Sequence, residues 1–403
     1  MEVFDLIRQQ SEYMKSVIPL IASENVTSKF VRECYLSDFG HRYAMGDVEK
    51  RIYSGCNIID RLEELAIKYT KELFGCEHAN VKPISGTIAN LAVYRALTEC
   101  GDKILALPVK CGGHFSFHDS ANVRCLRTVE MPFDPSEFNI DLDNAKKKII
   151  EERPKLVILG ASVFLFSHPV KELVEVAHEV GARVMYDGSH VLGLIAGKEF
   201  QDPIKEGADV VTASTHKTFP GPQRAVIMCK EELAEMIDYG VMPCVVSNHH
   251  IHSLAGYAMA CIEMLEFGRD YARQIVRNAK ALAEELYNLG YNVLCPHLEF
   301  TKSHQVVVDV GNGCEVVGKL EKANILTNPC LLPWDDDKAS GIRIGVQEVT
   351  RLGMKEDEMR EIARFIDMAL KDKKPIKDIK NEIKEFKSNF LTVKYTFEEH
   401  PAY

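Results

Sequence analysis

The chain has 403 residues, which is too long for one small domain and suits two or three domains that share a cleft. With 46% hydrophobic and 27% charged residues, its composition is that of an ordinary globular protein. The formal net charge of −10 argues against a nucleic-acid-binding protein, because no basic excess offsets the repulsion of a phosphate backbone.

Several other classes of protein are also disfavoured. The first residues carry acids and no apolar segment of the kind that forms a signal peptide. The longest apolar run, Leu156 to Phe166, is far shorter than the ~20 residues of a membrane helix. The 12 cysteines contain no CxxC pair, and the histidines at 249, 250 and 252 lack acidic or thiol ligands at matching spacing. We therefore expect a cytoplasmic protein with reduced thiols, no metal site and no membrane contact.

In chain order, residues 1–35 are expected to form helical and extended pieces that pack on another surface, such as a partner subunit. Between residues 80 and 230, short apolar runs alternate with amphipathic stretches. This alternation predicts an α/β domain with a mostly parallel sheet that is covered on both faces and binds ligands at the carboxyl ends of its strands. The expected strands are Lys103–Leu107, Leu156–Leu159, Arg183–Tyr186, Val210–Ala213 and Ala225–Cys229, and the expected helices are Ile88–Glu99, Asp141–Glu152 and Val170–Val180.

A long helical pattern from His252 to Leu289 then predicts an interdomain helix. We expect an N-terminal arm at 1–35, a large domain at 36–260 and a small C-terminal domain at 261–403. The small domain is expected to be α+β, with strands Gln305–Val310 and Ile342–Val346 and helices Glu315–Ala323 and Glu356–Leu370.

A lysine and an aspartate follow two of the predicted strands. Lys217 lies just beyond the run that ends at Ala213, where a buried amine has a depressed pKa and attacks aldehydes. Alone, Lys217 is more simply interpreted as a surface lysine in a loop. Asp187, thirty residues earlier, stands where a carboxylate can pair with the ring nitrogen of pyridoxal phosphate (PLP). A turn-capping role for Asp187 would not explain His190 or the lysine, and the pair is more specific than either residue.

Two further motifs fit the same cofactor. Ser85-Gly86-Thr87 stands immediately before a predicted helix, where free N–H groups and the helix dipole favour a phosphate. A simple helix cap is the alternative. In Gly112-Gly113-His114, an imidazole on a glycine-rich loop could stack on a pyridine ring.

Together these motifs resemble the serine hydroxymethyltransferase family, whose members are fold-type I PLP-dependent transferases. The resemblance runs from Leu20–Asn25 to Ser340–Gly345, and the sequence around His168-Pro169 and Tyr186-Asp187 is similar to the archaeal branch, which uses a modified pterin rather than folate. The shared landmarks are Lys50-Arg51-x-Tyr53-x-Gly55-Cys56, Ala79-Asn80-Val81, Ser85-Gly86-Thr87-x-Ala89-Asn90, Gly112-Gly113-His114 and Thr215-His216-Lys217-Thr218.

The resemblance implies a role for each matching residue. Lys217 forms the Schiff base with PLP, Asp187 meets the pyridine nitrogen and His114 stacks on the ring. Arg343 clamps the carboxylate of the amino-acid substrate. The other implied contacts are His190 and Ser162 at the ring hydroxyl, Ser85, Gly86 and Thr87 at the phosphate, Thr215 and His216 in the lysine motif, Ser23 at the substrate, and Tyr43 and Tyr53 from the neighbouring subunit of a homodimer.

The chain departs from the family at three places. Met45 replaces a glutamate that shuttles a proton in hydroxymethyl transfer, and a thioether neither donates nor accepts a proton. Asp47 or Glu49 could replace it if the loop is shifted. Arg224 and Ala225 stand where the family has two glycines, so Arg224 is expected to bind the cofactor phosphate or another anionic group. Cys330 replaces an asparagine near the pterin.

These features leave several functions open. The first is reversible transfer of a hydroxymethyl group between serine and a reduced pterin of the folate or tetrahydromethanopterin type. The second, favoured by Met45, is pterin-independent aldol cleavage or transaldol transfer on β-hydroxy amino acids such as allo-threonine. Sulfur transfer through Cys330 and a PLP-binding protein without activity are further alternatives.

Overall fold

The computed structural model describes residues 1–403, and its largest sheet has seven strands. Strand β12 is antiparallel to both of its neighbours, whereas the adjacent strands from β11 to β6 are all parallel. The predicted α/β class with a mostly parallel sheet is confirmed. In spatial order the strands are β4 (His78–Asn80), β12 (Ala225–Cys229), β11 (Val210–Ser214), β10 (Arg183–Asp187), β9 (Leu156–Gly160), β5 (Lys103–Ala106) and β6 (Arg127–Glu130).

The sheet is buried on both faces, which explains why its strands are continuous apolar runs. In β9, Val157 and Leu159 face one hydrophobic cluster, and Leu156 and Ile158 face another. This alternation follows from the two-residue period of a strand. Helices α4 (Gly86–Leu97) and α8 (Ala234–Val241) cover one face, and α3 (Asn57–Phe74), α5 (Leu142–Glu152), α6 (Val170–Glu179) and α7 (Leu192–Ala196) contribute to the cluster on the other.

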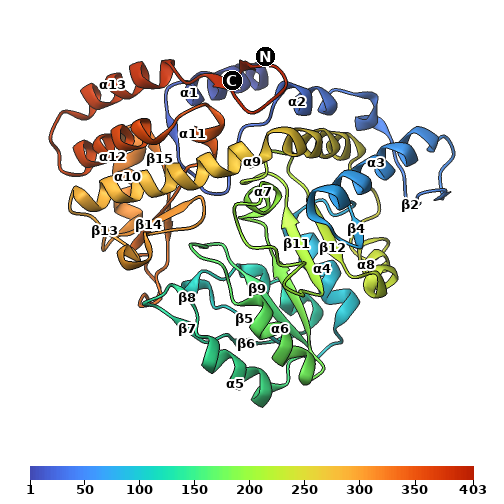
Figure 1. Cartoon of the computed structure of the whole chain (residues 1–403). Coiled ribbons are helices and arrows are strands. Elements are labelled where there is room, and N and C mark those ends of the chain that lie inside the picture. Colours follow the sequence, from blue (N-terminus) through green and yellow to red (C-terminus); the bar gives the residue numbers. More distant parts are fainter.

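Helix α9 (Ile251–Asn288) connects the two main parts of the molecule. It packs against α2 (Lys29–Tyr35), α3 and α7 on one side and against α11 (Gln347–Arg351) and α12 (Glu356–Leu370) on the other. Figure 1 shows it crossing between the large sheet and the C-terminal elements. The expected domain boundary at residue 260 lies inside this helix, so no linker separates the two units there.

The C-terminal unit contains a four-stranded antiparallel sheet, as expected for an α+β domain. Its strands are β13 (Asn292–Val293), β14 (Gln305–Asp309), β17 (Gly341–Gly345) and β16 (Asn328–Cys330). Helix α10 (Gly313–Lys322) packs on it, α12 packs on α10 and α9, and α13 (Ile376–Ser388) packs on α12. Three further strand pairs are β2 (Gly46–Asp47) with β3 (Lys50–Arg51), β7 (Phe133–Asp134) with β8 (Asn139–Ile140), and β18 (Thr392–Val393) with β19 (His400–Pro401).

The N-terminal arm contacts its own chain in part. Strand β1 (Ile18–Pro19) pairs in parallel with β15 (Ile325–Leu326), which belongs to the C-terminal unit. Helix α1 (Glu2–Met14) has no buried residue, and Phe4 and Ile7 are exposed on it. The two termini lie close together in Figure 1. No helix is both long enough and apolar enough to cross a membrane.

Candidate active site

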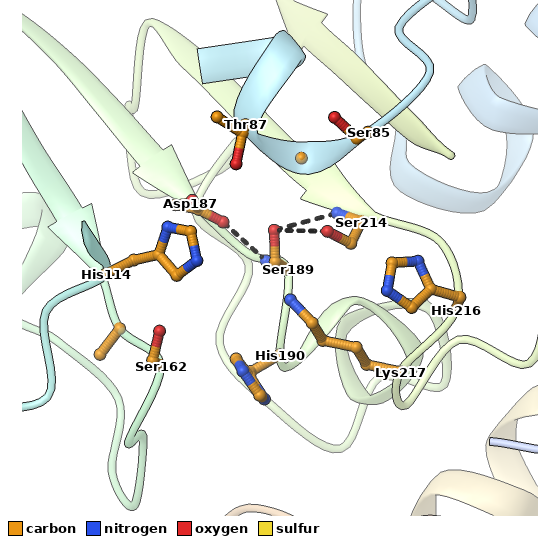
Figure 2. A pocket seen from close by; sticks show the side chains of 12 residues that line it. Ser85, Thr87, His114, Ser162, Asp187, Ser189, His190, Ser214, His216 and Lys217 are labelled. Atoms are coloured by element: carbon orange, nitrogen blue, oxygen red, sulfur yellow. Dashed lines mark hydrogen bonds between the residues drawn. The ribbon is translucent and has the colours of Figure 1, made fainter. Parts of the chain in front are cut away.

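A cavity of about 190 Å³ opens at the carboxyl edge of the large sheet. Strands β9, β10 and β11 end there at Gly160, Asp187 and Ser214, and α4 begins there at Gly86. Figure 2 shows the side chains of these segments converging on one space. The twelve lining residues are Ser85, Gly86, Thr87, His114, Ala161, Ser162, Asp187, Ser189, His190, Ser214, His216 and Lys217. Motifs that are far apart in the sequence therefore form one site.

Lys217 follows β11 and projects into the cavity (Figure 2). Its side chain is buried, and its Nζ makes no hydrogen bond with the other lining residues that are drawn. The pKa of Lys217 is lowered to about 8. Burial is the main cause and the Arg343 charge adds to it, whereas the Asp187 charge opposes it. A substantial neutral fraction near neutral pH makes this amine a competent nucleophile toward an aldehyde.

Asp187 ends β10 and is held in a fixed orientation. Its Oδ2 accepts a hydrogen bond from Asn90 Nδ2 at 2.9 Å, and its Oδ1 accepts one from the Ser189 backbone N–H at 3.0 Å. Asn90 is itself oriented, because its Oδ1 accepts a hydrogen bond from Thr212 Oγ1 at 2.7 Å. The neighbouring residue on β9, Gly160, has φ +98°, and a Cβ there would lie 2.1 Å from the Asp187 carbonyl oxygen, so only glycine fits beside this carboxylate.

The start of α4 forms an anion-binding end of the cavity. Ser85 caps the helix, since its side chain accepts a hydrogen bond from the Ile88 N–H at 3.3 Å. The N–H groups of Gly86 and Thr87 precede the first intrahelical bond and carry the positive end of the helix dipole. A Cβ on Gly86 would lie 2.5 Å from Ser214 Oγ, so a larger residue would displace the hydroxyls that line the cavity.

Three histidines line the cavity, and all are shifted toward the neutral form. Burial lowers the pKa of His216 to about 4, that of His190 well below its ordinary value, and that of His114 to a smaller extent. His216 Nδ1 is buried without a hydrogen-bond partner. With Lys217 for the aldehyde, Asp187 for the ring nitrogen and the α4 start for the phosphate, the lining fits PLP.

Arg343 lies on β17 and reaches the side of the cavity that holds Ser162. Its Nη1 donates to the Ser162 carbonyl at 2.6 Å, and its Nε and Nη2 each lie 3.3 Å from Asn328 Oδ1. Its charge lowers the pKa of both Lys217 and His190, which agrees with a position near the cavity, although Arg343 is not one of the lining residues.

Four expected site residues lie elsewhere in the protomer. Thr215 is buried, and its hydroxyl donates to the Pro222 carbonyl at 2.7 Å. Ser23 lines a second cavity of about 330 Å³ that shares only His216 with the first. Tyr43 and Tyr53 are exposed, with ring centroids 5.0 Å apart, and neither lines the cavity.

Arg224 requires a correction, because it is enclosed within the protomer and does not line the cavity where a phosphate would bind. Its side chain is fully buried. Its Nη1 donates to the His249 carbonyl at 3.2 Å and to Ser253 Oγ at 2.7 Å, and its Nη2 donates to the Val81 carbonyl. Because these acceptors occupy both Nη groups and the side chain is fully buried, Arg224 joins loops instead.

Some residues of the site were not predicted. Ser189 and Ser214 line the cavity, and the Ser214 N–H donates to Ser189 Oγ at 3.0 Å. Their position beside Asp187 and the lysine motif was the available signal. Asn90 lies in a recognised motif, but only the fold shows that it holds Asp187. Cys330 is outside the lining, and burial raises its thiol pKa to about 12, which disfavours a thiolate for sulfur transfer.

Comparison with known proteins agrees with this geometry. The family model "Serine hydroxymethyltransferase" matches residues 1–366. The chain is 57% identical to a serine hydroxymethyltransferase of Archaeoglobus fulgidus, with 100% of the chain and 94% of the relative covered. It is 53% identical to that of Methanothermobacter marburgensis, with 99% and 96% covered. The chain belongs to the serine hydroxymethyltransferase family.

The structural comparison extends this family assignment to the fold. The chain matches L-threonine transaldolase from Pseudomonas fluorescens, solved in its internal aldimine state, with a TM-score of 0.93 and 30% identity. The match covers 98% of the chain and 93% of the transaldolase. As a serine hydroxymethyltransferase family member, the chain is an enzyme with the fold-type I architecture of PLP-dependent transferases.

Proposed function

We propose that this enzyme uses PLP to transfer a hydroxymethyl group reversibly between serine and a reduced pterin, with glycine as the other product. The observation that carries the proposal is the placement of Lys217, Asp187 and the start of α4 around one cavity. Membership of the serine hydroxymethyltransferase family over nearly the whole chain supports the reaction type. The carrier is a pterin of the folate or tetrahydromethanopterin type.

Each part of the site has a distinct task. When bound, PLP accepts the electron pair that is released as the Cα–Cβ bond of serine breaks. Lys217 holds the cofactor aldehyde, and the oriented Asp187 carboxylate keeps a proton on the ring nitrogen. The free N–H groups of Gly86 and Thr87 bind the phosphate. Arg343 binds the substrate carboxylate with the planar fork of donors that suits a bidentate contact.

The proposal includes a homodimer with shared active sites. Tyr43 and Tyr53 are exposed on the protomer and lie outside its own cavity, which suits residues that serve a neighbouring subunit. Mixing equal amounts of Lys217→Ala and Tyr53→Phe enzymes tests this. In a symmetric dimer, each mixed dimer has one intact site, so about a quarter of the parental activity should return. If the two variants each lack activity and the mixture recovers none after subunit exchange, the sites are not shared.

Met45 supports a second candidate, a pterin-independent aldolase or transaldolase that acts on β-hydroxy amino acids such as allo-threonine. The Met45 side chain is partly buried against a hydrophobic cluster and cannot shuttle a proton. The Asp47 carboxylate is paired with Lys82 Nζ at 2.5 Å, which disfavours it as a replacement for the missing glutamate. Glu49 stands in the turn between β2 and β3 with φ 61°.

The two candidates are separated by measuring serine cleavage with and without tetrahydrofolate or tetrahydromethanopterin, beside allo-threonine cleavage. For the transferase, serine cleavage depends on the pterin. Met45→Glu then raises it by up to ~10²–10⁴-fold if general acid–base catalysis is the only missing part. Asp47→Asn with Glu49→Gln abolishes it only if one of these acids does the shuttle's work. Faster cleavage of allo-threonine than of serine with either pterin, unchanged by Met45→Glu, would reject the transferase.

A further inference from the structure

His190 is the cavity residue whose hydrogen-bonding role depends most on its surroundings. A neutral imidazole has one donor and one acceptor nitrogen, and the partner of one nitrogen decides the state of the other. His190 Nδ1 lies 3.0 Å from Gln305 Nε2, and Nε2 of His190 has no partner within the protein. The orientation of the Gln305 amide therefore determines what His190 presents to the cavity.

The Gln305 amide can take only one orientation. It is fully buried at the start of β14, where its Oε1 accepts a hydrogen bond from the Phe164 backbone N–H at 2.8 Å. Its Nε2 donates to the Ser162 carbonyl at 2.9 Å. A backbone N–H can only donate and a carbonyl can only accept, so exchanging the amide nitrogen and oxygen would break both bonds. The Nε2 group therefore presents its second hydrogen to His190 Nδ1.

A second ring nitrogen, that of His304, lies near His190 Nδ1. His304 Nε2 lies 3.2 Å from the Ala22 carbonyl oxygen, which requires a hydrogen on that nitrogen. The same His304 Nε2 lies 3.5 Å from His190 Nδ1. Neither neighbour can accept a hydrogen from His190 Nδ1, because Gln305 Nε2 and His304 Nε2 both carry hydrogens and have no free lone pair.

We infer that Gln305 is a positioning residue that holds His190 as the neutral tautomer with its proton on Nε2. His190 then offers the cavity a fixed hydrogen-bond donor, suited to an anionic oxygen of the cofactor ring or substrate, and does not act as a base. The tautomer follows from the protein alone, whereas its use in catalysis rests on the proposed function.

The charges around His190 agree with this assignment. Burial lowers the pKa of His190 most strongly, and the charges of Lys217, Arg343, His304 and His114 lower it further. Gln305 Nε2 and Arg343 Nη1 both donate to the Ser162 carbonyl, so the two side chains share one acceptor. One amide therefore connects the orientation of His190 to that of Arg343.

The test is ¹⁵N NMR of the full-length, cofactor-free protein with labelled histidines, in which the His190 signals are assigned by their loss in His190→Asn. At pH 7 the parent should show a protonated Nε2 and an unprotonated Nδ1 for His190. A proton on Nδ1, or on both nitrogens, in the parent would overturn the inference. This result stands even if a Gln305 variant fails to fold.

Two substitutions at Gln305 sharpen the test. Gln305→Glu places an acceptor against Nδ1, so His190 should acquire a proton there. Gln305→Leu removes the amide donor and adds no acceptor, so it should weaken the preference for Nε2 without moving the proton fully to Nδ1. A Gln305→Glu spectrum identical to the parent's would also overturn the inference. In the holoenzyme, Gln305→Glu should lower kcat by about 10- to 100-fold, as for the loss of a charged hydrogen bond, with a smaller change in KM for serine. If the parent shows the expected ¹⁵N signals but does not cleave serine, the proposed function is rejected and the tautomer assignment still holds.

Discussion

Two regions of this enzyme each bury a lysine near a carboxylate, but only one of these lysines is paired with its carboxylate. In the active-site cavity, Lys217 Nζ is left without a hydrogen bond from the lining residues drawn in Figure 2. Beneath the segment that carries Tyr43 and Met45, Lys82 Nζ instead contacts Asp47 at 2.5 Å and Glu63 at 3.4 Å. We call this second group, formed by Arg51, Asp60, Glu63, Lys82 and His249, the ion cluster.

The ion cluster satisfies its charges almost completely. Arg51 donates to Asp60 and Glu63 at 2.7 Å each, and to the carbonyls of Ala44 and Gly46. It thereby fixes the backbone on both sides of Met45. Burying an unpaired charge is costly. A buried lysine without a charged partner in a cavity therefore indicates a binding site, whereas a paired lysine indicates a structural role.

The largest effect is expected at Lys217. Lys217→Ala should lower activity by at least ~10²–10⁴-fold, because it removes the nucleophilic amine and a group that moves protons. Borohydride should fix PLP covalently to the parent enzyme at Lys217 and nowhere in the variant, as shown by peptide mass mapping. The control is Lys230→Gln: Lys230 also follows a strand, but it is paired with Asp209 at 2.8 Å. Fixation at another lysine of the parent would refute the assignment.

Removing a charge from the ion cluster should lower the stability of the fold. Glu63→Gln leaves Arg51 and Lys82 without their shared partner, so the free energy of unfolding should fall by about 3–5 kcal/mol. Chemical denaturation measures this, with Glu152→Gln at a more exposed ion pair as the control that should change little. A loss no larger than the control's would mean that the buried pairs contribute nothing net.

The same cluster gives a pH dependence with a defined sign. Burial alone would raise the pKa of Glu63, but the approach of His249 Nε2 to 3.0 Å and the charges of Lys82 and Arg51 lower it to about 2 from its ordinary value of 4.5. A carboxyl with a lowered folded pKa stabilises the fold above its unfolded pKa and loses this effect as the pH falls. The stability difference between the parent and Glu63→Gln should therefore shrink between pH 4.5 and pH 2.

At the substrate side, Arg343→Ala should raise KM for amino acids by about 10- to 100-fold, which corresponds to a charged hydrogen bond of roughly 1.5–3 kcal/mol. Arg343→Lys keeps the charge but loses the planar fork, so it should recover only part of the affinity. Steady-state kinetics with serine and with ethanolamine, which lacks the carboxylate, checks this. Equal affinity of the parent for both compounds would contradict the carboxylate clamp.

The smallest effect is expected at a helix cap, and it should distinguish Ser85 from a second capping serine. Ser85 caps α4 at the cavity and Ser28 caps α2 elsewhere, each accepting a hydrogen bond from the residue three positions on. Either serine changed to alanine should cost about 0.5–2 kcal/mol of stability. Only Ser85→Ala should also weaken PLP binding, which equilibrium titration of the apoenzyme measures. Equal PLP affinity of the two variants would remove Ser85 from the phosphate site.

The sequence by itself determined most of the elements and the central part of the site. Strand β12 and helix α12 have the bounds that their patterns predict, because apolar period and length distinguish strands from helices in this chain. Lys217 and Asp187 were placed in one site because the carboxyl ends of parallel strands meet at one edge of a sheet. Such inferences need only local pattern and one rule of topology.

Only the tertiary structure decided which charged and polar groups are free and which are occupied. Nothing in the residues around Arg224 shows that carbonyl oxygens enclose its guanidinium, and a sequence separation of 115 residues hides the contact between Gln305 and His190. The boundary expected at residue 260 lies inside one continuous helix, α9, on which both units pack. Partners of buried polar groups are set by how distant segments pack, and local pattern carries no record of that packing.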